Sequence, residues 1–384
     1  MTTVQRDQPL GRLPIAVDAM GGDNAPGEIV AGALRAASEL GVRILLVGRR
    51  EAIDSELRQA GGTTSSGAIE VVDATEVIAM DEHPANAVRT KKDASIVRAC
   101  RLVAEGRAGA AVSAGNSGAM LAAALFTVKR IPGVARPAIG AAFPSENGTT
   151  FILDVGANTD CKPEWLAQFA LMGDTYARRM LGIDDPRVAL LSNGEEPEKG
   201  SELVQAAHPL LQALSVHFIG NIEGKDLFRG ACDVAVTDGF TGNVALKTAE
   251  GVGEFLFASI RKQAKGSLGG IIGGALLKPK LRPLRDSVDY RKTGGALLLG
   301  VAGEIVIAHG RSDAEALVNA IGVAQRAAEQ DVSGTIATAV GKQLADAAKA
   351  APAGESSARP PRIRPPHIAE EPADLLSDFT VRQG

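Results

Sequence analysis

Five segments of the chain place glycine together with Asp, Asn, Ser or Lys directly after an apolar run. The first, PIAVDAMGGDNAPG at residues 14–27, ends its apolar run in Asp18 and then turns at Gly21 and Gly22. A strand, a glycine turn and a helix often build a phosphate site, because N–H groups at the start of the helix point at the anion. These residue types therefore predict an anion-binding turn.

The other four turns lie in the segments AVSAGNSGAM, FILDVGANTDCKP, LLSNGEEPEKGSE and DVAVTDGFTGNVALK. Together the five turns supply the candidate site residues Asp18, Gly21, Gly22, Asn116, Ser117, Asp154, Asn158, Lys162, Asn193, Gly194, Lys199, Gly200, Asp238, Gly239, Gly242 and Asn243. A helix cap needs a single polar residue, whereas these turns carry several. Because ligands of open α/β sheets bind beyond the carboxyl ends of the strands, the five turns predict one shared cleft.

The glycine spacing differs from both common nucleotide motifs. AMGGDNAPG is not G-x-G-x-x-G, and G-x-x-x-x-G-K-[ST] does not occur in the chain. A net charge of −4 and an aromatic content of 3% are unlike those of a nucleic-acid surface, which needs cations and stacking platforms. The pattern therefore disfavours a dinucleotide or a nucleic acid as the ligand.

The elements that must position these turns alternate between β-branched runs and helical patterns. The runs predicted as strands are residues 15–19, 43–48, 68–73, 109–115, 137–143, 151–156, 187–194, 215–220 and 233–239. Several lack apolar–polar alternation, which is typical of strands that are covered on both faces. The order predicts an α/β protein with a doubly wound, mostly parallel sheet, in a single domain of residues 14–345.

Three stretches depart from this rhythm. Residues 1–13 are expected to be a flexible N-terminus, and the Pro-rich residues 350–384 a disordered tail. Residues 265–285, KGSLGGIIGGALLKPKLRPLR, are apolar with bordering cations and predict a protruding segment. Two interpretations remain open for it: contact with an anionic membrane surface, or a hairpin that packs or contacts a second copy.

The cysteine content and the lengths of the apolar runs indicate in which compartment the protein lies and whether it binds a metal. The three cysteines are odd in number and far apart, which disfavours a disulfide framework and a zinc site, so we expect no metal. No apolar run approaches the roughly 18 residues of a spanning helix, and residues 1–12 lack the apolar core of a signal peptide. We expect a cytoplasmic protein, with membrane association through residues 265–285 as an open possibility.

Seven segments together resemble a known family. They are IAVDAMGGDNAPGEIVAGA, AVSAGNSGAML, LDVGANTDCKPEWLAQFALMG, VALLSNGEEPEKG, FIGNIEGKDLF, VTDGFTGNVALKTAEG and GGALLLGVAGEIVIAHG, in order from about Ile15 to about Gln330. In them the chain resembles the bacterial phosphate acyltransferase family of phospholipid synthesis, also called acyl-ACP:phosphate transacylase. The resemblance implies a homodimer and a fold similar to that of phosphate acetyltransferases and the isopropylmalate dehydrogenase group.

The resemblance also implies a reaction. A long-chain fatty acyl group would pass from acyl carrier protein to inorganic phosphate, and a membrane acyltransferase would use the acyl phosphate to acylate glycerol 3-phosphate. We expect no cofactor. The other functions left open are a phosphate acetyltransferase-like enzyme using acyl-CoA, an oxidoreductase of the related fold, and a non-catalytic protein that binds acyl-ACP or is recruited to membranes.

Attack of phosphate on a thioester needs charge neutralisation, alignment and donors for the developing oxyanion. Lys199 is the predicted phosphate ligand, with the backbone amides around Gly194 and Gly200. Asn193 and Asn243 are predicted to donate hydrogen bonds to phosphate or to the acyl carbonyl. Lys162 would add a second positive charge, and Asp154 and Asp238 would orient these donors or accept a proton.

Other groups receive weaker predictions. Cys161 lies in one of the turns, but direct transfer requires no covalent acyl-enzyme. His83 and His309 could approach a cleft as bases. Residues 83–101 carry the cations Arg89, Lys91, Lys92, Arg98 and Arg101, which would suit docking of the acidic acyl carrier protein or form a solvated helix face.

Overall fold

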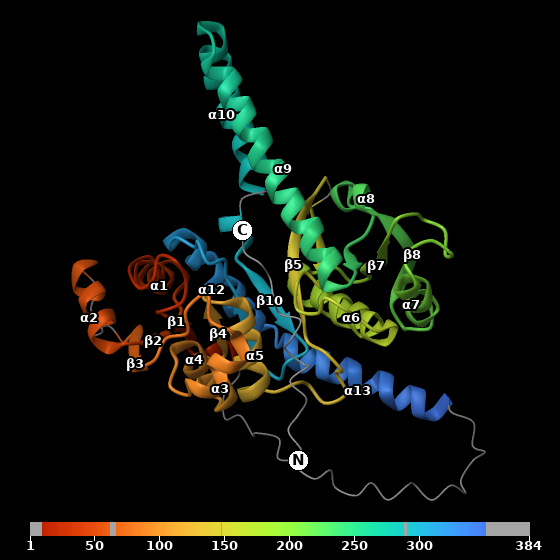
Figure 1. Cartoon of the computed structure of the whole chain (residues 1–384), viewed down its shortest axis with the longest axis horizontal. Helices are drawn as coiled ribbons and strands as arrows, with labels where there is room; N and C mark the ends of the chain where they lie inside the picture. Colours follow the sequence, from red (N-terminus) through yellow and green to blue (C-terminus); the bar gives the residue numbers. More distant parts are fainter. Residues whose placement is uncertain (1–9, 62–66, 147, 288–289, 351–384) are drawn as a thin grey trace, which may run out of the picture.

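Eleven strands form one sheet in the computed structural model, which describes residues 10–61, 67–146, 148–287 and 290–350 (Figure 1). The strands are β1 (Ile15–Asp18), β2 (Ile44–Gly48), β3 (Ile69–Asp73), β4 (Ala110–Ser113), β5 (Ala138–Ser145), β6 (Gly148–Leu153), β7 (Arg187–Ser192), β8 (His217–Glu223), β9 (Val234–Val236), β10 (Ala296–Leu299) and β11 (Glu304–Ile307). Their order is β3-β2-β1-β4-β11-β10-β5-β6-β9-β7-β8. Residues 1–9 and 351–384, which include most of the two predicted flexible ends, lie outside the described residues.

The sheet consists of two parallel groups joined by antiparallel strands. In the first group β3, β2, β1, β4 and β11 are parallel, and in the second β6, β9, β7 and β8 are parallel. Between them, β11 pairs antiparallel with β10, β10 with β5, and β5 with β6. Three reversals leave the two groups running in opposite directions, so their carboxyl ends point to opposite edges of the sheet.

Helices cover both faces of the sheet, as the apolar strands predict. They are α1 (Gly27–Leu40), α2 (Arg50–Gln59), α3 (Pro84–Thr90), α4 (Ser95–Ala104), α5 (Ser117–Thr127), α6 (Pro163–Tyr176), α7 (Glu202–Gln212), α8 (Gly224–Arg229), α9 (Gly239–Lys265), α10 (Leu268–Ser287), α11 (Tyr290–Thr293), α12 (Ala314–Glu329) and α13 (Val332–Ala350). Two short helices complete the described chain, η1 (Leu10–Arg12) and the π-helix η3 (Ala177–Leu181).

Two hydrophobic cores lie on the two faces of the sheet. On one face, α1, α2, α6, α7, α12 and α13 pack on side chains such as Ile15 and Val17. On the other face, α3, α4, α5 and α8 pack on the intervening side chains, such as Ala16, with α9 at the rim. All four residues of β1 are buried, which confirms that this strand is covered on both faces.

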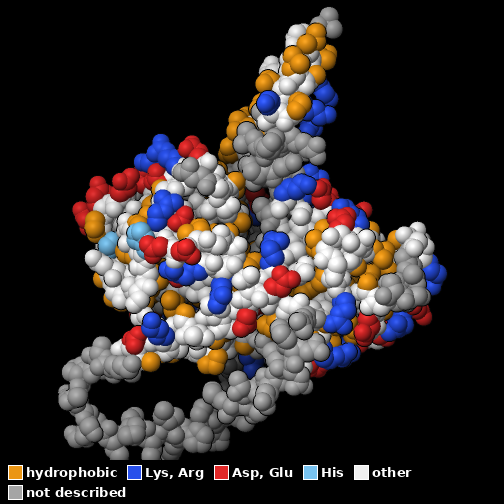
Figure 2. Space-filling model, turned by 180° about the vertical axis from the view of Figure 1, so that it is seen from behind, with side chains coloured by type: hydrophobic (Ala, Val, Ile, Leu, Met, Phe, Trp, Pro, Cys, Tyr) orange, Lys and Arg blue, Asp and Glu red, His pale blue; other side chains and the backbone are white. Residues whose placement is uncertain are grey.

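The hairpin of α9 and α10 projects from this body (Figure 1). Residues 265–285, expected as an apolar and basic protruding segment, begin at the last residue of α9 and form most of α10. Exposed apolar side chains lie along both helices, among them Phe255, Leu256, Ile271, Ile272 and Leu276. In Figure 2 apolar side chains and Lys and Arg side chains lie next to one another on the projecting hairpin. Among the described helices, none is long and apolar enough to cross a membrane.

Candidate active site

A cavity of about 780 Å³ lies on the face of the sheet that carries α5 and α9. Its floor is formed by β5, with Ile139, Ala141 and Phe143, and by Ile307 at the end of β11. Phe228, Leu246 and Ala249 add further apolar surface. This volume lies within the usual range of small-molecule sites, and the lining is mostly apolar with a few polar groups.

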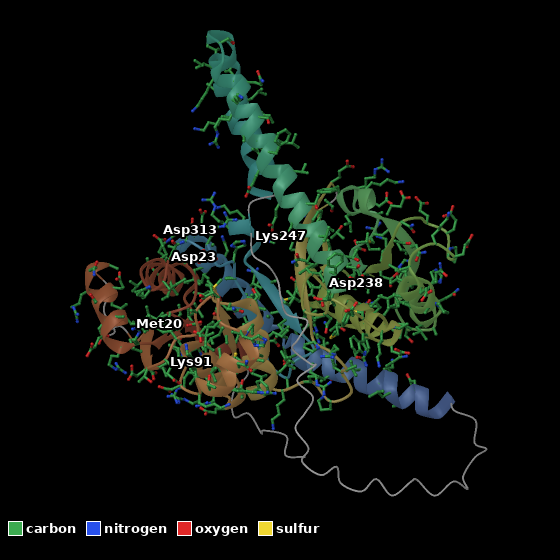
Figure 3. All side chains as sticks on the ribbon, viewed as in Figure 1. Met20, Asp23, Lys91, Asp238, Lys247 and Asp313 are labelled. Atoms are coloured by element: carbon green, nitrogen blue, oxygen red, sulfur yellow. The ribbon has the colours of Figure 1, made fainter. Side chains whose placement is uncertain are left out.

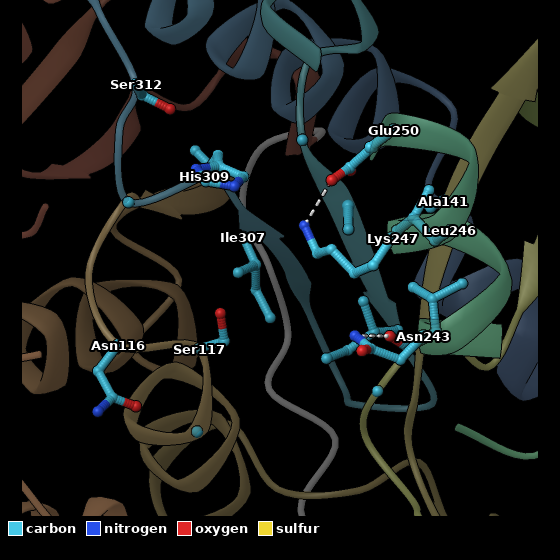
Figure 4. A pocket seen from close by; sticks show the side chains of 18 of the residues that line it. Asn116, Ser117, Ala141, Asn243, Leu246, Lys247, Glu250, Ile307, His309 and Ser312 are labelled. Atoms are coloured by element: carbon cyan, nitrogen blue, oxygen red, sulfur yellow. Dashed lines mark hydrogen bonds and ion pairs between the residues drawn. The ribbon is translucent and has the colours of Figure 1, made fainter. Parts of the chain in front are cut away.

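The first polar group belongs to the turn between β4 and α5, on one side of the cavity (Figure 4). Asn116 is the N-cap of α5, because its Oδ1 accepts a hydrogen bond from the Ala119 amide at 3.0 Å. Its Nδ2 donates to the Met80 carbonyl at 2.8 Å and to the Glu82 carbonyl at 3.3 Å. Asn116 thus joins two walls of the cavity, and Ser117 lies beside it.

The first turns of α9 form the opposite side of the cavity (Figure 4). Asn243 donates from Nδ2 to the Val155 carbonyl at 3.1 Å. One turn later, Lys247 Nζ forms an ion pair with Glu250 Oε2 at 2.8 Å, so the charge of this lysine is already paired. His309 faces the same space, and burial followed by the nearby Lys247 lowers the pKa of its imidazole.

Asp154 lies at the carboxyl end of β6, fully buried beneath this side of the cavity. Its carboxylate accepts hydrogen bonds from the backbone amides of Ile139, Gly156, Ala157 and Asn158 at 2.7–3.0 Å. The Asn158 side chain donates a fifth at 2.8 Å. Burial raises the pKa of this carboxyl, whereas these donors counteract that effect. Asp154 therefore holds the loop that follows β6 and does not face the cavity.

Three residues at the start of α9 hold this helix against the loop that follows β6. Asp238 caps the helix by accepting hydrogen bonds from the Thr241 amide and hydroxyl, both at 2.8 Å. The Gly239 amide donates to the Asn158 carbonyl at 2.7 Å. A Cβ on Gly242 would lie 1.9 Å from the Asp154 carbonyl oxygen, so a side chain has no room there. These contacts place Asn243, and one turn further Lys247, at the cavity (Figure 4). Figure 3 shows where Asp238 and Lys247 lie in the whole chain.

Asp18 and its glycine turn lie behind the opposite wall. The Asp18 carboxylate is 2% exposed and accepts hydrogen bonds from the Ser113 hydroxyl at 2.7 Å and the Met20 amide at 3.1 Å. Burial raises the pKa of Asp18, and the hydrogen bonds with Ser95 and Ser113 oppose this shift. Gly21 and Gly22 pack against the Ser113–Gly115 segment. This turn therefore packs against the cavity wall that contains Gly115, on the side away from the cavity.

The turn between β7 and α7 lies outside the cavity. Asn193 and Lys199 are exposed, and the stem of Lys199 passes over Gly194, where a Cβ would lie 2.7 Å from Lys199 Cγ. Asn221 on β8 holds the turn by donating to the Glu196 carbonyl at 2.8 Å. Lys162, at the N-cap of α6, is also exposed. Neither lysine forms a salt bridge with another residue that the structure describes.

The prediction of one cleft shared by all five turns is wrong. Of the predicted residues, Asn116, Ser117 and Asn243 line the cavity, while Asp18, Gly21, Gly22, Asp154, Asn158, Gly239 and Gly242 pack behind its walls. Asn193, Gly194, Lys199, Gly200, Lys162 and Asp238 belong to the opposite carboxyl edge and do not line it. For the turn after β7 the physical reason is strand order, because β6 and β9 lie between β7 and the cavity floor on β5.

The sequence reasoning missed several cavity residues. Met80, Glu82 and Glu250 line the cavity without having been singled out, and Lys247 was noted only as part of a turn. His83 and His309 do line it, as expected for residues near a cleft. Burial raises the pKa of the Cys161 thiol to about 12, with further contributions from Asp154 and Asp238. This thiol is therefore protonated at neutral pH and a poor nucleophile.

Comparisons with known proteins agree along most of the chain. A family model described as "Fatty acid synthesis protein" matches residues 13–335. A phosphate acyltransferase of Heliobacterium modesticaldum is 52% identical over 319 residues, which cover 83% of this chain and 95% of that protein. A phosphate acyltransferase of Nostoc punctiforme is 50% identical over 324 residues, covering 84% of this chain and 94% of that protein.

Solved structures agree with the fold. A phosphotransacetylase from Streptococcus pyogenes superimposes with a TM-score of 0.57 and 16% identity, covering 88% of this chain and all of that chain. EutD phosphotransacetylase from Staphylococcus aureus gives 0.54 and 17%, covering 86% of this chain and 95% of that chain. These likenesses confirm the predicted α/β fold and its similarity to phosphate acetyltransferases. From its sequence relatives, the chain belongs to the phosphate acyltransferase family and is an acyltransferase.

Proposed function

We propose that the protein transfers a long-chain fatty acyl group from acyl carrier protein to inorganic phosphate, forming acyl phosphate for phospholipid synthesis. The observation that carries the proposal is the large cavity with apolar walls next to Asn243. Asn243 belongs to the turn after β9, at the sheet edge where the exposed Lys162 and Lys199 also lie, and neither lysine forms a salt bridge with another described residue. The similarity to phosphate acyltransferases of other organisms supports phosphate as the acceptor. The apolar floor along β5 suits an acyl chain and its pantetheine arm.

In the proposed reaction, an oxygen of hydrogen phosphate attacks the thioester carbonyl carbon. A C–O bond forms, the C–S bond breaks with its electron pair on sulfur, and the phosphate proton passes to the thiolate. The products are acyl phosphate and the free thiol of the carrier protein. Phosphate is already an anion at neutral pH, so the protein needs to align it and to stabilise the oxyanion rather than to supply a nucleophile.

We assign phosphate to the edge where β9 and β7 end, near Lys199 and Lys162. β9 and β7 are neighbouring parallel strands, so the turns that begin at Asp238 and Asn193 leave the sheet at the same edge. An unpaired exposed lysine can neutralise an incoming anion, whereas Lys247 is already paired with Glu250. Asn243, between this edge and the cavity, is the proposed donor to the acyl carbonyl.

Two surface contacts complete the proposal. The tip of the α9–α10 hairpin, with Ile271 and Ile272 at 54% and 64% exposure near Lys262 and Lys265, is assigned to an anionic membrane surface. The apolar residues further along the hairpin, such as Phe255, are assigned to a second copy of the chain in a homodimer. Acyl phosphate would then form close to the membrane acyltransferase that consumes it.

The test is release of free thiol from palmitoyl-ACP by the purified protein, with and without phosphate, and with mass detection of acyl phosphate. Phosphate-dependent release that yields acyl phosphate is the expected result. A preference for short acyl-CoA would favour a phosphate acetyltransferase-like enzyme. Release without phosphate dependence would identify a thioesterase, and tight binding without release a non-catalytic acyl-ACP-binding protein.

A further inference from the structure

The loop between β3 and α3 forms a wall of the cavity in which the sequence analysis singled out only His83. Four consecutive residues of this loop, Met80 to His83, line the cavity together with Pro84 at the start of α3. The loop contacts the segment after β11. The Met80 side chain lies so close to Gly310 that a Cβ there would be 3.0 Å from Met80 Cε. Its conformation therefore decides the width of the cavity on this side.

An ion pair closes this loop on itself. Glu82 Oε1 accepts a hydrogen bond from the Ala79 amide at 2.7 Å and from Lys91 Nζ at 2.6 Å. Lys91 Nζ also donates to the Val77 carbonyl at 2.9 Å. One ammonium group at the end of α3 thus holds both the beginning and the end of the stretch from Val77 to Glu82. The Lys91 and Glu82 side chains are 32% and 31% exposed, so the pair is only partly solvated.

A second contact ties the same loop to the predicted substrate turn. Asn116 donates to the carbonyls of Met80 and Glu82 while its Oδ1 caps α5. Two side chains therefore hold the loop: Asn116 through its Nδ2 and Lys91 through its Nζ. Hydrogen bonds from the Ala79 amide and then from Lys91 lower the pKa of Glu82, which keeps its carboxylate charged at neutral pH.

The neighbouring cations that suggested a docking patch are also engaged within the chain. Arg98 lies 3.6 Å from Asp93, and Arg101 donates to the Lys92 carbonyl at 3.1 Å. The Arg89 guanidinium lies 5.5 Å from the centre of the Phe126 ring. Lys91 is the member of this group whose side chain holds a cavity wall. Its role therefore differs from that of a solvated surface charge.

We propose that Lys91 and Glu82 are positioning residues of the acyl-transfer reaction: their ion pair clamps the loop of residues 77–82 in the conformation that accepts the acyl donor. The proposal rests on the proposed function, because it takes the cavity as the acyl-donor site. Neither side chain needs to contact the reacting atoms. The clamp acts through the position of Met80 and the backbone around it.

The decisive experiment compares the direction in which two neutralising substitutions, Lys91→Met and Glu82→Gln, change the KM for palmitoyl-ACP. Under the clamp, each raises the KM for palmitoyl-ACP about 5-fold, the KM for phosphate stays unchanged, and the double variant loses no more than either single one. Under charge-driven docking of an acidic carrier protein, Lys91→Met weakens binding and Glu82→Gln strengthens it. Opposite signs would therefore overturn the proposal.

Matched controls exist on the same surface. Lys92→Met removes the adjacent exposed lysine, and Glu39→Gln breaks an exposed ion pair with Arg35 at 2.9 Å on α1, remote from the cavity lining. Both are expected to leave the KM values unchanged, and Lys91→Arg, which can keep the pair, to stay within about 2-fold of wild type. Equal effects of Lys91→Met and Lys92→Met would reject the clamp, as would a fall in kcat alone with the KM for the acyl donor unchanged.

Hydrogen exchange of the peptide covering residues 77–82 tests the clamp without relying on the reaction. Both Lys91→Met and Glu82→Gln should accelerate exchange in this loop relative to Lys92→Met, with the melting temperature within a few degrees of wild type. Unchanged exchange would overturn the clamp. If wild type makes no acyl phosphate, the proposed function fails, whereas the exchange result still decides whether the clamp exists.

Discussion

Asn243 Nδ2 lies 3.1 Å from the Val155 carbonyl oxygen, and this hydrogen bond joins the first turn of α9 to the loop that follows β6. The two residues are 88 positions apart in the chain. The bond fixes one wall of the cavity at the point where the apolar floor meets the carboxyl edge of β6 and β9. Asn243 therefore lies between the proposed acyl-donor cavity and the sheet edge to which phosphate is assigned.

Replacing Asn243 by Asp should reduce kcat/KM for acyl transfer by about 100-fold, the loss typical of one oxyanion donor. A carboxylate oxygen cannot donate to the Val155 carbonyl and repels the developing oxyanion. Asn319→Asp is the matched control, because Asn319 Nδ2 makes the same type of bond to the Arg291 carbonyl at 2.7 Å outside the cavity lining. Steady-state kinetics of both variants, with circular dichroism for folding, provide the measurement. Equal losses would remove Asn243 from the site.

Neutralising Lys199 should impair phosphate use more than neutralising Lys247. Lys199→Gln is expected to raise the KM for phosphate by about 10-fold, because a charge-assisted hydrogen bond to the anion is lost. Lys247→Gln should change it less, since Glu250 already pairs with that ammonium. The KM values for phosphate and for palmitoyl-ACP are measured for each variant. The reverse ranking would move the phosphate site into the cavity beside Lys247.

Filling the apolar floor should shorten the preferred acyl chain. Ala141 lines the cavity on β5, where Ala141→Phe would occupy space that the proposal gives to the acyl chain. We expect kcat/KM to fall much more for palmitoyl-ACP than for a donor with a six-carbon chain. Ala213→Phe, at the exposed C-cap of α7, controls for the added ring. An equal fall for both donors would mean that the chain binds elsewhere.

The acid dependence of stability should depend on Asp233. Burial alone would raise its pKa, but hydrogen bonds from the Arg187 guanidinium and amide outweigh this and lower it below the ordinary value of 3.8. The resulting stabilisation is complete above the unfolded-state pKa and is lost as the pH falls through the folded-state pKa. Asp233→Asn should therefore reduce the free energy of unfolding by about 2 kcal/mol at pH 7 and much less near pH 3.

Urea unfolding at pH 3, 5 and 7 measures this difference for wild type and Asp233→Asn. Asp160→Asn is the control, because it makes the same substitution at an exposed position. A constant difference between wild type and Asp233→Asn at all three pH values would show that the carboxylate charge is not what stabilises this contact.

Binding to vesicles should depend on the tip of the α9–α10 hairpin. The double variant Ile271→Glu/Ile272→Glu is expected to lose flotation with vesicles containing phosphatidylglycerol, because two exposed apolar side chains become anionic. Leu344→Glu, with 51% exposure on α13, is the matched control. Sedimentation of the same variants reports the oligomeric state. Unchanged flotation would end the membrane assignment, and dissociation of a dimer would assign the tip to the second copy.

The sequence by itself determined the α/β class, most of the strands and the turns that carry polar residues. Local patterns suffice for this, because a strand covered on both faces shows a continuous apolar run such as residues 15–17, and a helix start such as Asn116–Ser117 needs a cap whatever lies around it. The family resemblance likewise follows from short motifs in order. Each of these signals is contained within a stretch of about twenty residues.

Only the tertiary structure decided which turns share a site. The four-residue strands β10 and β11 were not recognised, yet they lie in the centre of the sheet, and with β5 they reverse the direction of its second half. Strand order keeps Lys199, which follows β7, away from Asn116, whereas Met80, Lys247 and His309 come from three distant segments and line one cavity. Strand pairing is a contact between distant residues, so no local pattern encodes it.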